Sequence, residues 1–192
     1  SVSTALIDGL IYAAGGIVGS TTVSNCAVYD PVLDSWTSLA PVPAGDGRNH
    51  AAAGTDGERF YIFGGRGQGS GACNCVADGF DSVQIYDPLT DTWITSDDLV
   101  APGSDLAPLP VQRGGTGKAI WYRGEFYVFG GETQNNPGGY ADPVDRVYDR
   151  VDVYNPVTNT WRLEAEMPTA RHGIYPVLYQ SRMFVAGGGW KA

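Results

Sequence analysis

The stretch YDPVLDSW, residues 29–36, returns as YDPLTDTW at 86–93 and as YNPVTNTW at 154–161. In each copy a tyrosine comes seven positions before a tryptophan. Proline fixes φ and the side chain of Asp or Asn can cap a turn, so the Asp-Pro or Asn-Pro pair predicts a hairpin corner. The repetition indicates a unit of folding that the chain uses three times.

A double glycine lies upstream of each copy, at the end of a short hydrophobic run, and a fourth run ends in the same way. The first glycines stand at positions 15, 64, 130 and 187, which gives steps of 49, 66 and 57 residues. Repeats of this length with four strand-like segments are typical of propeller blades. Glycine weakens a strand, so its recurrence suggests that a bulky group approaches the backbone there. The tryptophan one hairpin later is the candidate for that group.

These motifs resemble the kelch repeat, and the resemblance spans essentially the whole chain. It implies an all-β fold, a kelch-type β-propeller of four-stranded blades related to that of galactose oxidase. We expect about three and a half blades, at residues 1–43, 48–110 and 113–168, with a half blade at 171–192. The residues that carry the resemblance are Gly15–Gly16, Tyr29 and Trp36; Gly64–Gly65, Tyr86 and Trp93; Gly130–Gly131, Tyr154 and Trp161; and Gly187–Gly188.

The last repeat supplies two strands of four. Kelch propellers resemble closed rings, and an open ring would leave unpaired strand edges, which invite aggregation. We therefore expect this chain to be part of a larger closed propeller, with the remainder supplied by a longer chain or by another subunit.

In this architecture the first strand of each blade lines the central channel. The longest connections are 66–80 and 132–146, between the second and third strands of two blades, and 96–113, which leads from one blade to the next. All three are expected to emerge on one face. Long glycine-rich loops on a rigid scaffold commonly carry binding, which is the function we predict for this face. The alternative is that they are tolerated insertions.

Three arginines recur in phase with the double glycines: Arg48, Arg113 and Arg171. At the channel mouth three guanidinium groups would suit a carboxylate or phosphate. The alternative is that they bond the carbonyl groups of neighbouring blades. His50, His172 and Glu132 join them as candidate binding residues, and Glu132 is the best-placed carboxylate on this face.

No catalytic residue, metal site or cofactor is predicted. Two histidines in different blades do not supply the three or four converging ligands that a copper or zinc site needs. The copper ligand set of galactose oxidase is not reproduced. The sialic-acid mutarotases, another group with a similar fold, use a few polar channel residues, which this sequence does not rule out.

The net charge and the cysteines limit the classes of partner and the compartments that the sequence favours. A formal net charge of −9 disfavours a nucleic-acid-binding surface, because phosphate binding needs clustered Lys and Arg, and we expect no nucleic-acid partner. No apolar run reaches membrane-spanning length. Cys26 falls at a core position of a strand, where it would be buried. Cys73 and Cys75 lie in a loop, either bridged, which would favour an extracellular or other oxidising compartment, or both free.

The sequence therefore favours a kelch-repeat binding module that engages a protein or carbohydrate, an acidic one suiting the arginines. Two alternatives stay open: a propeller enzyme acting on an acidic sugar, as the mutarotases do, and an architectural subunit of a larger assembly. The enzyme would need a deep channel pocket, and the module a broad loop surface.

Overall fold

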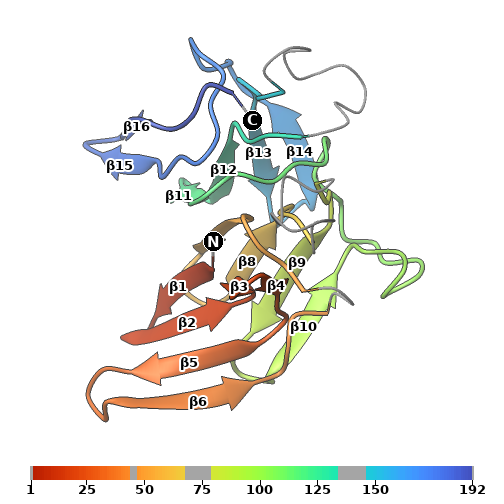
Figure 1. Ribbon diagram of the computed structural model, residues 1–192, viewed down its shortest axis with the longest axis vertical. Helices are drawn as coiled ribbons and strands as arrows, with labels where there is room; N and C mark the ends of the chain where they lie inside the picture. Colours follow the sequence, from red (N-terminus) through yellow and green to blue (C-terminus); the bar gives the residue numbers. More distant parts are fainter. Residues whose placement is uncertain (1, 44–46, 68–78, 134–145, 192) are drawn as a thin grey trace.

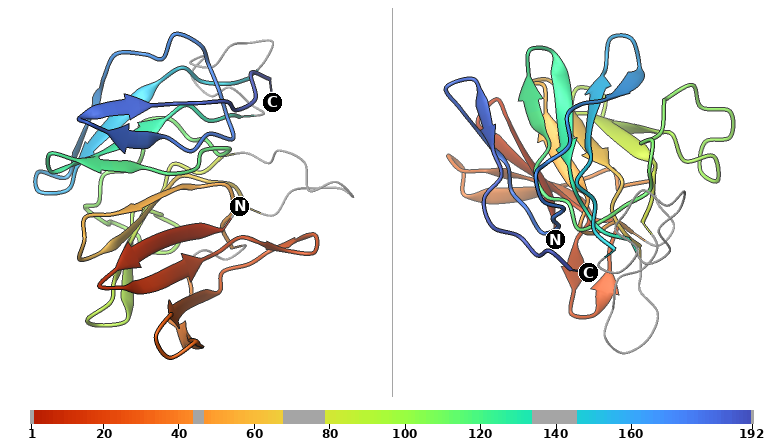
Figure 2. Two further views of the ribbon diagram at one scale, coloured as in Figure 1. Left: turned by 90° about the vertical axis from the view of Figure 1, so that its left-hand side faces the viewer. Right: turned by 90° about the horizontal axis from the view of Figure 1, so that it is seen from above.

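The computed structural model describes residues 2–43, 47–67, 79–133 and 146–191 (Figure 1). Within these ranges every regular element is a β-strand, which confirms the all-β expectation. The strands form successive antiparallel sheets stacked side by side around a common centre, as the two views of Figure 2 show.

Each of the first three blades is a four-stranded sheet whose strands follow chain order from the inner edge to the outer one. The first contains β1 (Ser3–Ile7), β2 (Leu10–Ala14), β5 (Cys26–Asp30) and β6 (Ser35–Leu39). The second contains β7 (Ala52–Thr55), β8 (Phe60–Phe63), β9 (Val83–Asp87) and β10 (Thr92–Thr95). The third contains β11 (Ile120–Tyr122), β12 (Glu125–Phe129), β13 (Val151–Asn155) and β14 (Thr160–Leu163).

The described residues also form two smaller, two-stranded sheets. The half blade is the pair β15 (Val177–Tyr179) and β16 (Arg182–Phe184). A hairpin of β3 (Ile17–Val18) and β4 (Thr21–Thr22) lies in the connection between β2 and β5. It lies on the opposite side of the blades from the short turns that join first and second strands (Figure 2, left).

The Tyr-to-Trp motif is the hairpin between the third and fourth strands, as predicted. Tyr29 and Trp36 are directly paired across β5 and β6, with ring centroids 5.1 Å apart. The side chain of Asp30 accepts hydrogen bonds from the main chain of the turn, at 2.8 Å from the nitrogen of Val32. The other two copies repeat the cross-strand pair.

The group that approaches the double glycines is not the tryptophan, so that expectation is wrong. A Cβ on Gly64 would lie 2.7 Å from the main-chain oxygen of Arg113, which opens the next blade. Gly15 meets the oxygen of Arg48, and Gly130 that of Arg171, in the same way. The main chain of the following blade therefore requires glycine here, and all these glycines have positive φ.

The hydrophobic core lies between blades. Tyr12 of the first blade and Phe60 and Tyr86 of the second share one cluster. Val83 and Ile85 face the opposite way, into the cluster between the second and third blades. Cys26 is buried in the first cluster, as predicted, and burial raises the pKa of its thiol to about 12. Each sheet is thus stabilised by its neighbours.

Candidate functional site

The two long connections within blades start and finish at equivalent points of neighbouring blades. Bridges between Arg66 and Gly79, and between Glu132 and Val147, close their bases. The third connection ends beside the first, since the N–H of Arg113 donates to the carbonyl of Phe80 at 3.1 Å. Residues 68–78 and 134–145 of the predicted loops lie outside the described residues.

A chain of polar contacts, here called the rim network, runs across the base of these connections. It consists of Thr22, Asn49, Arg66, Glu132 and His172. The side-chain amide of Asn49 donates to the Thr22 hydroxyl at 2.6 Å, and Asn49 and Arg66 exchange main-chain hydrogen bonds. A guanidinium nitrogen of Arg66 lies 2.8 Å from one Glu132 oxygen, and Nδ1 of His172 lies 3.1 Å from the other.

The rim network joins all four units of the chain. Thr22 belongs to the first blade, Asn49 and Arg66 to the second, and Glu132 to the third, while His172 precedes the half blade. Both charged groups of the Arg66–Glu132 pair are buried. Burial lowers the pKa of Arg66, and the Glu132 carboxylate opposes that shift. A buried pair with both partners bonded fixes the relative position of two blades.

The three predicted arginines do not converge on an open channel mouth. Arg48 and Arg113 are only 1% and 0% exposed. Arg48 donates to the carbonyl of Gly64 at 3.2 Å, and its guanidinium lies over the Phe80 ring. Burial lowers the pKa of Arg48 to about 10. A fully buried guanidinium cannot touch a partner, so the expectation of a three-arginine receptor needs correction.

The other two arginines likewise bond the scaffold. Arg113 donates to the carbonyl of Val111 at 3.0 Å and to the Asp152 carboxylate at 2.6 Å. Arg171, which is half-buried, donates to the carbonyl of Gly187 at 2.8 Å. In Arg48 and Arg171 the acceptor is the carbonyl of the first glycine of the blade's own pair. These arginines therefore bond the scaffold, as the alternative held, but within their own blade and not to a neighbouring one.

Of the remaining candidates, the structure brings Glu132 and His172 together and places His50 nearby. The His50 ring contacts the Asn49 side chain, and Thr116 donates to the His50 carbonyl at 3.3 Å. Burial, and next the positive charge of Arg66, lower the pKa of His50 to about 4. His50 is therefore neutral near pH 7.

Sequence reasoning missed Thr22, Asn49 and Arg66. Arg66 stands directly after a double glycine, the position that Glu132 occupies in the next blade, so the repeat register itself was the available signal. No group of three or more metal-binding side chains occurs among the described residues. No helix in the described ranges could span a membrane. Cys73 and Cys75 fall outside those ranges.

Stacked four-stranded sheets with connections gathered at a polar rim define the chain as a segment of a β-propeller. The sequence model described as Kelch motif matches residues 1–43, 47–96 and 122–168. The chain belongs to the kelch family. The resemblance and the fold expected from it, a partial kelch propeller, are confirmed.

Known proteins agree with this assignment. Kelch-like protein terF of Aspergillus terreus is 29% identical over 196 residues, covering 98% of this chain and 38% of that protein. An F-box/kelch-repeat protein of Arabidopsis thaliana is 30% identical over 178 residues, covering 88% and 33%. Mouse Kelch-like protein 35 is 25% identical over 185 residues, covering 95% and 26%. The chain thus spans less than two fifths of the length of these relatives.

A solved structure, described as "Structure of YjhT", has the same fold. It superposes with a TM-score of 0.76 at 22% identity, over 100% of this chain and 58% of that one. At this identity the similarity speaks to the fold alone.

Proposed function

We propose that this kelch-repeat module binds a protein partner on the face that carries connections 66–80, 96–113 and 132–146. The observation that supports the proposal is the rim network, which holds the bases of two long connections in one fixed arrangement. Binding loops on a rigid scaffold keep their contacts without a large ordering cost. In this proposal Glu132 and His172 position the loops, while Arg171 and His50 lie near enough to the rim to contact the partner.

Loop exchange tests the proposal. In one variant residues 68–78 and 134–145 are replaced by short Gly-Ser linkers. In the control, the turn between Asp56 and Glu58 on the opposite face is exchanged. Partners recovered from cell extract with the unaltered chain should be lost with the first variant and kept with the control. Recovery of the same partners by all three proteins would refute the loop-face assignment.

A second, architectural role has its own observation, in the contacts between the outer edges of neighbouring blades. The Trp93 indole donates to the carbonyl of Ala40 at 2.8 Å, and the N–H of Ala40 donates to Asp91 at 2.8 Å. The third blade makes the same pair of hydrogen bonds to the second. Trp161 donates to the carbonyl of Ala107 at 3.2 Å, and the N–H of Ala107 donates to Asn159 at 2.9 Å. Each blade thus holds one alanine of the blade before it.

The first blade carries the equivalent groups, Asp34 and Trp36, and within the described part of the chain no alanine of another blade is bonded between them. Trp36 is 61% exposed, and among the described residues its indole has no hydrogen-bond partner. We infer that this site receives the equivalent segment of a further kelch blade, so that the chain serves as one part of a larger propeller.

A tandem fusion tests this role. A copy of residues 47–113, which ends its blade with the Leu-Ala-Pro sequence held in both occupied sites, is placed ahead of Ser1. The other four tryptophans of the original chain and the one in the added copy are replaced by phenylalanine, so that Trp36 alone reports. Its fluorescence should be quenched less by acrylamide than in the unfused chain. Equal quenching in the two proteins would count against the role.

A further inference from the structure

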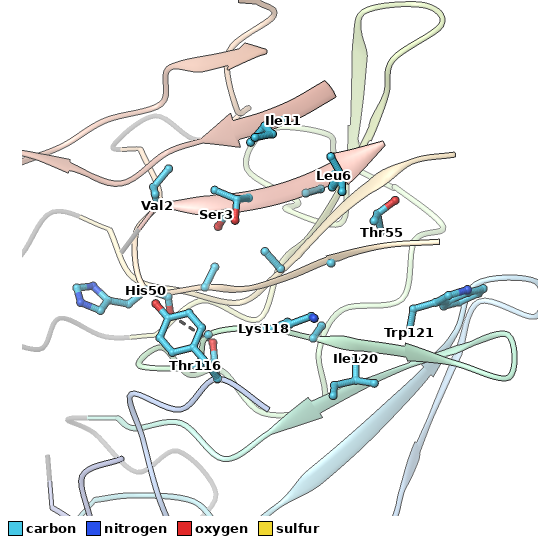
Figure 3. Close-up of a pocket in the computed structure, with 18 of the residues that line it drawn as sticks. Val2, Ser3, Leu6, Ile11, His50, Thr55, Thr116, Lys118, Ile120 and Trp121 are labelled. Atoms are coloured by element: carbon cyan, nitrogen blue, oxygen red, sulfur yellow. Dashed lines mark hydrogen bonds between the residues drawn. The ribbon is translucent and has the colours of Figure 1, made fainter. Parts of the chain in front are cut away.

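The inner edges of the blades line an open cavity of about 640 Å³ (Figure 3). Its wall comes from all four units: β1, β7, the segment leading into β11, and β15. A volume of this size is typical of sites for small organic molecules. None of the described residues that line the cavity belongs to connections 66–80, 96–113 or 132–146, although His50 lies both in its wall and near the rim.

Much of the wall is apolar, and its polar groups are mostly hydroxyls. Alanine side chains of the inner strands and the larger Ile120, Trp121 and Leu178 make the apolar part. Ser3, Thr55 and Thr116 contribute hydroxyl groups. The described lining contains no Asp or Glu.

Lys118 is the charged member of this wall. Figure 3 shows it near the middle of the group, between Thr116 and Trp121. Among the described residues its ammonium has no ion-pair or hydrogen-bond partner, and the whole chain has only one other lysine, Lys191. The other titratable wall residues are His50, which is neutral near pH 7, and Tyr175.

The backbone fixes the direction of Lys118. Ala53 donates to the carbonyl of Gly117 at 2.9 Å and accepts from the N–H of Ala119 at 2.8 Å, a parallel bridge between two blades. Successive side chains of an extended segment point to opposite sides. Ala119 is buried between the second and third blades, so Lys118 projects the other way, into the cavity.

We propose that this cavity binds a small organic carboxylate with an apolar body, whose carboxylate pairs with Lys118. Lys118 is exposed at the edge of an apolar wall that carries no carboxylate, so its ammonium favours an anionic ligand over a cationic one. One ammonium suits a monoanion, whereas phosphate sites usually assemble several cationic or N–H donors. The mainly apolar wall fits a hydrocarbon body better than a polyol.

The test measures binding of 4-phenylbutyrate to the chain by isothermal titration and saturation-transfer NMR, with neutral 4-phenylbutyramide as the matched ligand. Lys118→Met keeps the apolar stem and removes the charge, and Lys191→Met is the control variant. We expect saturable binding of the carboxylate, weakened about fivefold or more by Lys118→Met or by the amide, and unchanged in Lys191→Met.

Three results would overturn the proposal. They are absence of saturable binding by the carboxylate, equal affinity for acid and amide, and full retention of affinity in Lys118→Met. Thermal unfolding of each variant shows whether it is folded. Raising the salt concentration on the unaltered protein gives a mutation-free check, since it should weaken binding of the acid and leave the amide unaffected.

Discussion

Gly64 has no room for a side chain, and the reason is a neighbouring blade. Gly64→Ala would set a Cβ 2.7 Å from the Arg113 oxygen at a φ of +61°. We predict a loss of about 3 kcal/mol in the free energy of unfolding, from backbone strain plus displacement of the next blade. Gly124 also has positive φ but nothing within 4 Å of such a Cβ, so Gly124→Ala should cost only about 1 kcal/mol. Urea unfolding measures both, and equal losses would disprove the contact argument.

The rim network depends on the buried pair of Arg66 and Glu132. Glu132→Gln leaves the Arg66 charge buried and unpaired, so we predict a loss of about 3 kcal/mol in unfolding free energy. Glu125 forms a pair with Arg162 that is much more exposed. Glu125→Gln should therefore cost less than about 1 kcal/mol. Denaturant titration of the two variants gives the comparison; similar losses would mean that burial is not what makes the rim pair important.

The sequence allowed the rim residues to be predicted only in part. Glu132 and His172 follow repeated motifs, so their phase placed them on one face. Their contact depends on how two blades approach each other, and the repeat pattern does not determine that approach. Lys118 belongs to no motif, and a single lysine before a strand gives no signal by itself. Its exposure to the cavity follows from the parallel bridge at Ala53, a tertiary contact.

At the scale of elements, the hairpin of the third and fourth strands holds the preceding blade. Trp93→Phe removes the hydrogen bond to Ala40 and part of a packed ring, so we predict a loss of about 2 kcal/mol in unfolding free energy. Trp36→Phe, at the equivalent exposed position, should change it by less than about 0.5 kcal/mol. Thermal and urea unfolding test the pair, and a large effect of Trp36→Phe would contradict the proposed vacancy.

Strand order could be predicted well because each element is specified locally. The hydrophobic run, the glycines and the Asp-Pro corner of β8 and β9 each match one strand or turn. The contacts of the tryptophan could not be predicted, because its indole bonds a residue more than fifty positions earlier. Sequence reasoning placed it on its own blade's glycines, whereas it stabilises the boundary between blades.

Across the whole molecule, protection should decrease from the middle toward the half blade. β8 is fully buried and pairs on both sides, whereas β15 and β16 pair only with each other within the described residues and are largely exposed. We predict that amides of 177–184 exchange hydrogen about 100-fold faster than those of 60–63. Hydrogen-exchange mass spectrometry measures this; equal protection would mean that the half blade is covered in solution.

The hydrogen bonds that Asp91 and Trp93 make to Ala40 have a consequence for how the number of repeats changes in evolution. The second blade holds Ala40 of the first blade on one side, and its own Ala107 is held by the third blade on the other. The contact uses backbone atoms of the held residue, so it does not depend on which side chain that residue carries. A duplicated gene segment that encodes one repeat would therefore produce a blade able to form these hydrogen bonds with both of its neighbours. Blade number can thus change through simple duplication, while the loops diverge independently toward new partners.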